Sequence, residues 1–349
     1  MPSGGSGAGA LRGSWPRGDG LRVRAVVDVP VDDLAPVGDG TRRSVAEDLR
    51  YVYGEDQPTD WLEDGPGRDY PTMIRAARAA LGGRGLLDDV RLVVLVVTTP
   101  DLQHERLLGG FVADLFDGGP FTFCVTEQGL AGPFTALRLA GELLADGGPG
   151  GGSAGGAGEG ARGGAAVVLV LEQCTLPPTT TRVPARDRVV ALVVGRDGAG
   201  RPVEELSVVR APRGPRPAGR GASAGASDAP RKVVPDARRV VLGVDVDPAG
   251  VDPADVILLD GDVVRHADPG AAATGVWEVL ARDDAPDAPV VLHERCVELG
   301  YRCSLALGPR SAATAPEAGG RARGAVLAWA RGAARGRGGR GGRGGGARG

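Results

Sequence analysis

The amino-acid sequence predicts an α/β fold built on a parallel or mixed sheet. Residues 91–98 read RLVVLVVT, a nearly continuous β-branched run that is typical of a strand buried on both faces. Residues 73–81 read MIRAARAAL, a helical pattern that ends at Gly82 and Gly83. Apolar runs and helical patterns alternate along much of the chain, which is the arrangement of βαβ units.

The chain before and after these two elements continues the alternation. Residues 21–31 (LRVRAVVDVPV) are predicted to be a first strand, and residues 44–53 a short helix with Ser44 as its candidate N-cap. Residues 54–69 are rich in Asp, Pro and Gly and are expected to form a surface loop. A further helix is predicted over residues 102–116, directly after the buried strand.

A strand, turn and helix at residues 121–146 stand at the centre of the predicted fold. The strand is residues 121–125 (FTFCV), and the turn is Glu127-Gln128-Gly129. The helix N-terminus after the turn directs free N–H groups and its positive dipole end outward, and several unrelated enzymes present a nucleophile on such a turn. One face of the helix is apolar at three- and four-residue spacing: Phe134, Leu137, Ala140 and Leu144.

The later part of the chain repeats this pattern around two biased segments. Residues 147–164 and 211–231 are Gly- and Pro-rich and are expected to be flexible insertions. Residues 1–20 and 331–349 are expected to be disordered ends, which leaves residues 21–330 as one domain. Further strands are predicted at 165–171, 188–194, 239–246, 254–259, 289–292 and 325–330, and a helix at 274–281.

Composition narrows the class of protein. The 349 residues, 42% of them hydrophobic, are enough for a sizeable core. A formal net charge of −3 argues against a nucleic-acid binder that uses the whole chain. Four cysteines without paired spacing, no signal peptide and no bilayer-spanning apolar run predict a cytoplasmic protein with free thiols and no membrane partner.

The segment at residues 121–146 resembles the nucleophile elbow of the β-ketoacyl synthases, in the thiolase superfamily. In that family the strand-to-helix turn carries a catalytic Cys, followed by small residues and an Ala-rich helix. Here residues 129–132 (GLAG) occupy the turn, and the position of the Cys falls on Gln128, Gly129 or Leu130. None of these three residues is a nucleophile.

The resemblance implies a thiolase-like five-layered α/β fold with two pseudo-duplicated halves, at about residues 21–195 and 235–330. Decarboxylating ketosynthases also use two His that donate hydrogen bonds to the developing oxyanion or enolate. The resemblance places Asp260, in VILLDGDVV, and Tyr301, in LGYRCSLALG, at these two positions. An ionised Asp cannot donate and Tyr is a weaker donor, so all three catalytic positions are changed.

The two polar residues of the turn each have two interpretations. Gln128 either takes the place of the Gln that replaces Cys in chain-length factors, or is a polar turn residue that caps the helix. Glu127 is either a buried general base or an exposed turn residue.

His293, Cys296 and Cys303 form the pattern H-x2-C-x6-C, which lacks the four ligands and paired spacing of a usual zinc site. His293 with Cys296 as a nucleophilic dyad would require a spatial proximity that the sequence does not establish. The Gly-rich runs lack the strand, G-x-G-x-x-G and helix context of a dinucleotide site. We therefore expect neither a metal nor a cofactor.

The leading hypothesis is a non-condensing partner of an active ketosynthase subunit, similar in role to a chain-length factor. It would act with an acyl carrier protein in polyketide or fatty-acid biosynthesis, as a homo- or heterodimer paired through a strand edge. The alternative is a thiolase-fold acyltransferase or decarboxylase that uses Gln128, Glu127 or His293. A third interpretation is an RNA-associated protein that acts through the Arg/Gly-rich residues 331–349.

Overall fold

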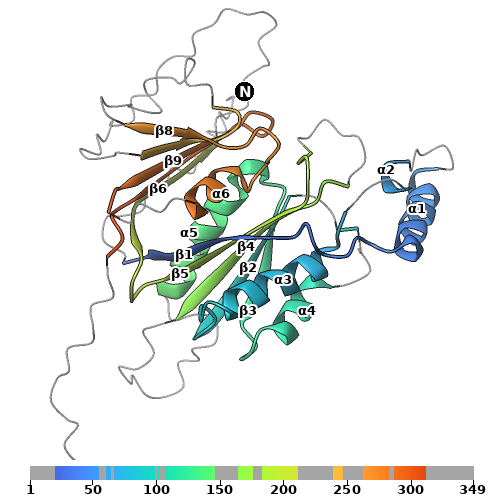
Figure 1. Cartoon of the computed structure of the whole chain (residues 1–349), viewed down its shortest axis with the longest axis horizontal. Coiled ribbons are helices and arrows are strands. Elements are labelled where there is room, and N and C mark those ends of the chain that lie inside the picture. The colour runs from blue at the N-terminus through green and yellow to red at the C-terminus, as the bar shows by residue number, and fades with distance from the viewer. Residues whose placement is uncertain are drawn as a thin grey trace, which may run out of the picture. The chain divides into compact units, whose positions relative to one another are not determined.

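The computed structural model (Figure 1) describes residues 20–54, 60–63, 67–98, 101–102, 107–145, 164–175, 183–210, 239–246, 262–282 and 287–311. The chain divides into two compact units, Met1–Ala313 and Thr314–Gly349, and the second lies wholly outside the described residues. Asp260 and the predicted strands at 254–259 and 325–330 also lie outside them. So do almost all residues of the predicted insertions and disordered ends.

Five strands form the first half of the sheet, in the order β3-β2-β4-β5-β1. β3, β2 and β4 are parallel neighbours, whereas β5 is antiparallel to both β4 and β1. Their bounds are β1 Arg22–Val29, β2 Val90–Val97, β3 Phe121–Thr126, β4 Ala165–Glu172 and β5 Arg188–Gly195.

Five further strands form the second half, in the order β8-β7-β9-β10-β6. β8, β7 and β9 are parallel neighbours, and β10 is antiparallel to both β9 and β6. Their bounds are β6 Arg201–Arg210, β7 Arg239–Leu242, β8 Val263–His266, β9 Val290–Cys296 and β10 Tyr301–Leu307.

The two half-sheets are copies of one arrangement. Strand order and strand orientation agree when β1 to β5 are matched in sequence to β6 to β10, so the chain contains an internal duplication. The half-sheets join between β1 and β6, where Arg22 lies opposite Pro202 and Val23 opposite Arg201. The second copy therefore begins at β6, and not near residue 235 as the sequence analysis expected.

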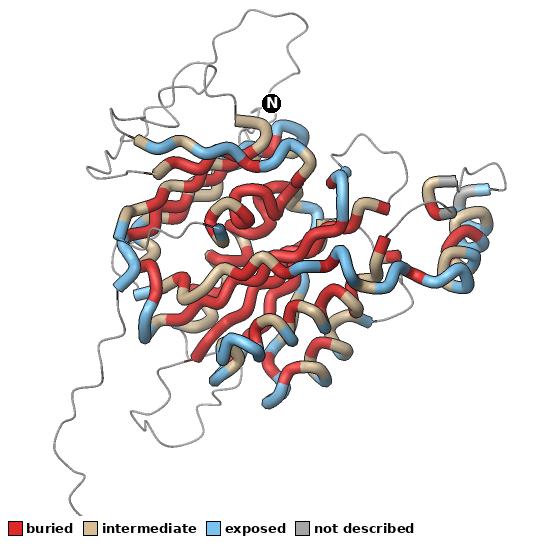
Figure 2. Tube along the Cα trace, viewed as in Figure 1, coloured by how far each residue is buried: buried red, intermediate tan, exposed pale blue. Residues whose placement is uncertain are grey.

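Four layers follow one another among the described residues. Helices α3 (Tyr70–Gly82) and α4 (Leu108–Leu115) cover one face of the first half-sheet (Figure 1). Helices α5 (Gly132–Ala145) and α6 (Gly275–Ala281) share one apolar cluster with inward-facing residues of both half-sheets. The two central helices therefore lie between the half-sheets; α6 is buried along most of its length, and α5 mainly in its N-terminal half (Figure 2).

The remaining connections complete the correspondence between the two copies. Helices α1 (Asp39–Tyr53) and α2 (Asp60–Glu63) form a smaller apolar cluster of their own in the first copy. In the second copy, the chain between β6 and β7 and most of the chain between β7 and β8 lie outside the described residues. None of the helices in the described ranges is both long and apolar enough to cross a membrane.

β2 shows why the apolar runs form the centre of the sheet. Successive side chains of a strand point to opposite faces. Accordingly Val94 and Val96 join the cluster around α5, while Val93 and Leu95 join the cluster around α3. The predicted burial on both faces is confirmed for residues 92–96, whereas Arg91 is exposed and Val97 and Thr98 are partly buried.

Several predicted boundaries were wrong for identifiable local reasons. Helix α1 begins at Asp39 with Gly38 at its N-cap, so Ser44 lies inside the helix and is not its cap. Helix α3 begins at Tyr70, because the Asp69 carboxylate accepts a hydrogen bond of 2.7 Å from the Thr72 N–H and Pro71 suits a first helical turn.

Other differences concern whole elements. The helix predicted at 102–116 is described only from Leu108 to Leu115. β6, β8 and β10 were not predicted as strands, because their sequences mix charged and apolar residues. β7 ends at Leu242, four residues before its predicted end.

The contact between the two central helices should be a main source of stability. The rings of Phe134 and Trp277 lie 5.1 Å apart, and both side chains are fully buried. We expect Phe134→Ala to lower the free energy of unfolding by about 3–5 kcal/mol in urea denaturation, because it leaves a cavity in the core. Phe121→Ala, at a half-exposed position, should cost far less. Similar losses in the two variants would contradict this account.

Candidate functional site

The strand-to-helix turn has the strained backbone that the sequence suggested. β3 ends at Thr126, and the next residues include two in the left-handed region, Glu127 at φ 57° and Gly129 at φ 51°. A 3-10 turn over Gly129–Ala131 then leads into α5. A non-glycine residue in this region carries a cost in conformational energy that is frequent at functional turns. We call residues 127–132 the elbow.

The elbow is held close to the neighbouring strand. A Cβ atom added at Gly132 would lie 2.7 Å from Val96 Cγ1 on β2. Only glycine allows the first turn of α5 to approach the sheet this closely. The position of the helix N-terminus is therefore fixed by the strand beneath it.

The opposite side of the elbow is occupied by the turn between β9 and β10. A Cβ atom added at Gly129 would lie 3.0 Å from Cys296 Sγ and 3.2 Å from Leu299 Cδ1. Cys296 is buried, and Leu299 packs against the main core. A side chain at residue 129 would therefore press on these two neighbours, which would have to shift by a few tenths of an ångström.

The polar side chains of the elbow belong to Gln128 and Glu127. Gln128 occupies the N-cap position of the 3-10 turn but makes no capping hydrogen bond with its side chain. Instead its Oε1 accepts a long hydrogen bond of 3.4 Å from the Thr135 hydroxyl. Glu127 is exposed, which agrees with the interpretation as a turn residue and excludes a buried base.

Tyr301 lies near the elbow, but its local structure differs from that of the ketosynthase motif. It is the first residue of β10, directly opposite Cys296 of β9. The residues after it form a strand, whereas the ketosynthase motif places a helix after the corresponding turn. The Tyr301 ring lies 5.3 Å from the Arg210 guanidinium. Asp260 lies outside the described residues, so the structure assigns no position to it.

His293 does not join this group. It lies on β9 three residues before Cys296, and the alternation of the strand places the two side chains on opposite faces. Burial lowers the pKa of His293 to about 4, so the imidazole is neutral at physiological pH. A His293–Cys296 dyad is therefore ruled out by geometry.

The H-x2-C-x6-C pattern also does not bring its three residues together. Cys303 lies opposite Glu294, on the same face of the sheet as Cys296, whereas the alternation of β9 places His293 on the other face. In the described part of the chain, no group of three or more His, Cys, Asp or Glu side chains could hold a metal ion.

A second polar cluster, which the sequence analysis missed, lies at the N-terminus of α6. Glu172, the last residue of β4, accepts a hydrogen bond of 2.6 Å from the Thr274 N–H through Oε1, and its Oε2 lies 3.0 Å from the Thr274 hydroxyl oxygen. The Thr274 hydroxyl also lies 3.1 Å from Glu278 Oε1. Arg188 binds both carboxylate oxygens of Glu278, at 2.6 and 2.7 Å. Two apolar runs in the sequence carried the available signal for this cluster. Glu172 is the last residue of AAVVLVLE, and Arg188 is the first residue of RVVALVV.

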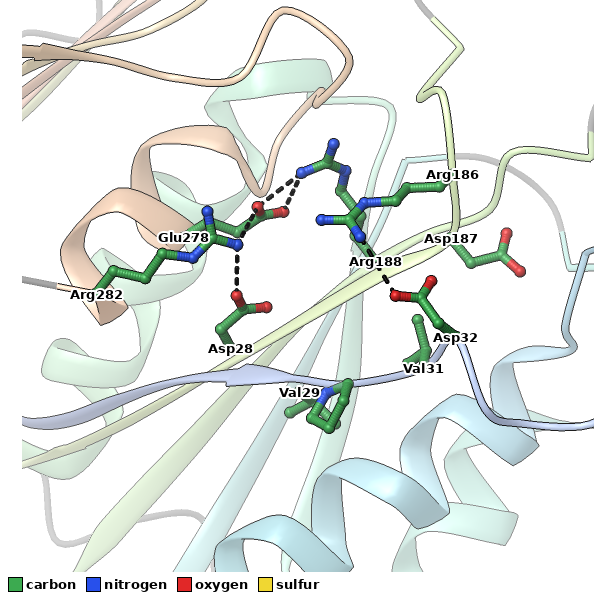
Figure 3. A pocket seen from close by; sticks show the side chains of 10 residues that line it. Asp28, Val29, Val31, Asp32, Arg186, Asp187, Arg188, Glu278 and Arg282 are labelled. Carbon is green, nitrogen blue, oxygen red and sulfur yellow. Dashed lines mark hydrogen bonds and ion pairs between the residues drawn. The ribbon is translucent and has the colours of Figure 1, made fainter.

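Beside this cluster lies a cavity of about 220 Å³ (Figure 3). Arg188 and Arg282 both point toward Glu278, and Arg282 also binds Asp28 at 2.7 Å. At the rim, Arg186 pairs with Asp32 at 3.3 Å. Acidic and basic side chains on the walls thus pair with one another.

Comparison with known proteins identifies the fold. No protein-family model matches the chain, and no curated protein matches it either. The solved structure of ChlB3, described as an acyltransferase, superposes with a TM-score of 0.51 at 15% identity, over 84% of this chain and 99% of that one. AbyA1, a tetronic acid condensing enzyme, gives a TM-score of 0.50 at 15% identity, over 82% and 99%. The chain has the thiolase fold.

A third structure, 3-oxoacyl-(acyl carrier protein) synthase III from Xanthomonas oryzae, superposes more loosely, with a TM-score of 0.43 at 14% identity, over 82% of this chain and 98% of that one. The duplicated strand order agrees with the fold expected from the elbow segment. At these identities the likeness concerns the fold, and the site must be judged from its own residues.

The packing in front of Gly129 can be tested with two glycines. Gly129→Ala combines a positive φ with close contacts to Cys296 and Leu299, whereas Gly85→Ala, at φ 64°, has no neighbour within 4 Å of the added atom. Both variants should carry the cost of a left-handed residue, about 1–2 kcal/mol. We expect Gly129→Ala to lose at least about 1 kcal/mol more in urea denaturation, through overpacking.

Adding Leu299→Ala to Gly129→Ala should recover part of that difference, because it removes one of the two contacts. Equal losses in the two alanine variants, or no recovery in the double variant, would show that the space in front of the elbow is open.

Proposed function

We propose that this chain is a non-condensing partner of an active β-ketoacyl synthase, similar in role to a chain-length factor. The observation that carries the proposal is the packing of Cys296 and Leu299 against Gly129. In a condensing enzyme of this fold, the nucleophile and its acyl group need that space in front of the helix. Here the strained elbow persists, and Cys296 and Leu299 pack closely against Gly129.

The three candidate positions for the nucleophile support the same conclusion. The Gln128 amide accepts from Thr135, Gly129 has no side chain, and Leu130 is buried in the main apolar cluster. None of them can form a covalent acyl intermediate. A protein with this elbow contributes through its shape and its surface rather than through acyl transfer.

The edge of the first half-sheet offers a surface for the partner. β3 pairs with β2 on one side, and its outer edge carries the half-exposed Phe121 and the exposed Cys124. An unpaired edge is a template for a strand of another chain. We place a ketosynthase subunit along β3 and an acyl carrier protein as the donor of substrate to the pair, in polyketide or fatty-acid biosynthesis.

Co-expression with ketosynthase and carrier proteins tests this function. Native mass spectrometry should detect a one-to-one complex of this chain with a ketosynthase subunit. Cys124→Arg, which places a charge on the β3 edge, should lower the yield of that complex about tenfold or more. Val263→Arg, at an exposed position of the other sheet edge on β8, should leave it unchanged. A complex insensitive to Cys124→Arg would remove β3 as the interface.

One observation favours a second candidate, since ChlB3 is described as an acyltransferase. In that case Glu127 or Gln128 would act in acyl transfer or decarboxylation on the same fold. The purified chain, without a partner, should then transfer an acyl group from coenzyme A or a carrier protein, or decarboxylate a malonyl group. Activity lost on Gln128→Ala would support this candidate and overturn the partner role; no activity above background is what the partner role expects.

A further inference from the structure

The cluster at α6 contains a hydrogen-bonding conflict that one proton resolves. The Thr274 hydroxyl lies 3.0 Å from Glu172 Oε2 and 3.1 Å from Glu278 Oε1. A hydroxyl has one hydrogen and can donate to only one of these oxygens. If both carboxylates were ionised, two lone pairs would face each other across the remaining contact. A proton on one of the two acids would let both contacts be hydrogen bonds.

The surroundings assign that proton to Glu172. Glu278 faces two cations, since Arg188 binds both of its oxygens and Arg282 approaches to 3.1 Å. Glu172 is fully buried, and this desolvation raises its pKa from the ordinary 4.5 to about 7. Hydrogen bonds from the backbone N–H groups of Thr274 and Ala272 and the charge of Arg188 offset only part of the desolvation.

We propose that Glu172, Thr274 and Glu278 form a proton-dependent latch that holds α6 to the first half-sheet, and that loss of the proton loosens α6. In the closed latch, Glu172 donates its proton to the Thr274 hydroxyl oxygen, and that hydroxyl donates to Glu278. When Glu172 ionises, the two carboxylates compete for one hydrogen inside a buried site, where an unsatisfied charge is expensive. Opening of α6 relieves this competition.

Arg188 and Asp268 also lie around the latch, but their pKa shifts favour the charged forms. Burial of Arg188 opposes its charge, but hydrogen bonds to Glu278 and Asp268 outweigh it and raise its pKa. The hydrogen bond from Arg188 lowers the pKa of Asp268. The remaining charged groups whose contacts reach the cluster are Asp28 on β1 and Arg282 directly after α6, which pair with each other, and Arg282 also binds Glu278. Asp187 lies on the opposite face, where it accepts from the Cys174 N–H.

The sign of the effect follows from the direction of the shift. A carboxyl whose pKa is higher in the closed state binds its proton more tightly there than in the open state. The stabilisation is therefore complete below about pH 4.5 and is lost as the pH rises through about 7. For these two values, opening of α6 should be about tenfold more frequent at pH 8 than at pH 6.

The latch can influence the elbow through the packed helices. Trp277 of α6 contacts Phe134, which lies in the first turn of α5. A looser α6 would release one wall of the helix that carries the elbow. The proposal does not depend on the partner role, because it concerns the internal packing of the chain.

Hydrogen–deuterium exchange at pH 6 and pH 8 tests the latch. After correction for the intrinsic exchange rates, the peptide over residues 275–282 should lose about tenfold in protection at pH 8, while the peptide over β2 keeps its protection. Glu172→Gln should abolish the pH dependence in α6. Glu294→Gln, which removes a different buried acid facing the core, should leave it as in the unmodified chain. Equal pH dependence with and without Glu172 would overturn the proposal.

A second measurement decides the question if Glu172→Gln does not fold. Carbon-13 NMR of the glutamate carboxyl groups in the unmodified chain should reveal one that titrates near pH 7. Its midpoint should shift in Thr274→Ala, which removes the shared hydroxyl. If every glutamate titrates near its ordinary pKa, the latch does not exist.

Discussion

Two helices buried between two half-sheets impose the main constraint on this protein. The first N–H groups of a helix have no partner within it, and at α5 and α6 these ends face the interior rather than water. Each end must therefore be satisfied or closely packed by residues from elsewhere in the chain. Three features meet this requirement: the elbow, the acidic cluster at α6, and the absence of side chains at Gly129 and Gly132.

The internal duplication lets the two solutions be compared at equivalent positions. At α6 the last residue of β4, Glu172, brings a carboxyl group to the helix N-terminus. At α5 the last residue of β9, Cys296, occupies the equivalent place and brings a thiol against Gly129. The same architecture thus supports a polar closure at one helix and an apolar closure at the other.

The sequence predicted those parts of the fold in which local pattern and tertiary environment agree. Residues 91–98 and 165–171 are apolar at every or nearly every position, and they lie at the centre of the first half-sheet. β6, with the sequence RPVEELSVVR, could not be recognised in this way, because its burial depends on the partner strand β10 and not on its own alternation.

The candidate site was predictable only in part. The turn at 127–129 is local, so its position could be read from the residues. Its surroundings are not local: Cys296 lies more than 160 residues away, and Thr274 lies 102 residues from Glu172. His293 and Cys296 illustrate the reverse error, since they are close in sequence but separated by the two faces of one strand.

Each central helix packs on strands of both copies, and this bears on whether either copy could fold alone. α5 belongs to the first copy but packs against β6 and β10 of the second, while α6 belongs to the second and packs against β1 of the first. A chain cut between β5 and β6 would leave each fragment with an uncovered apolar face. Each copy therefore depends on the other to cover its apolar surface, and the two are expected to fold as one cooperative unit.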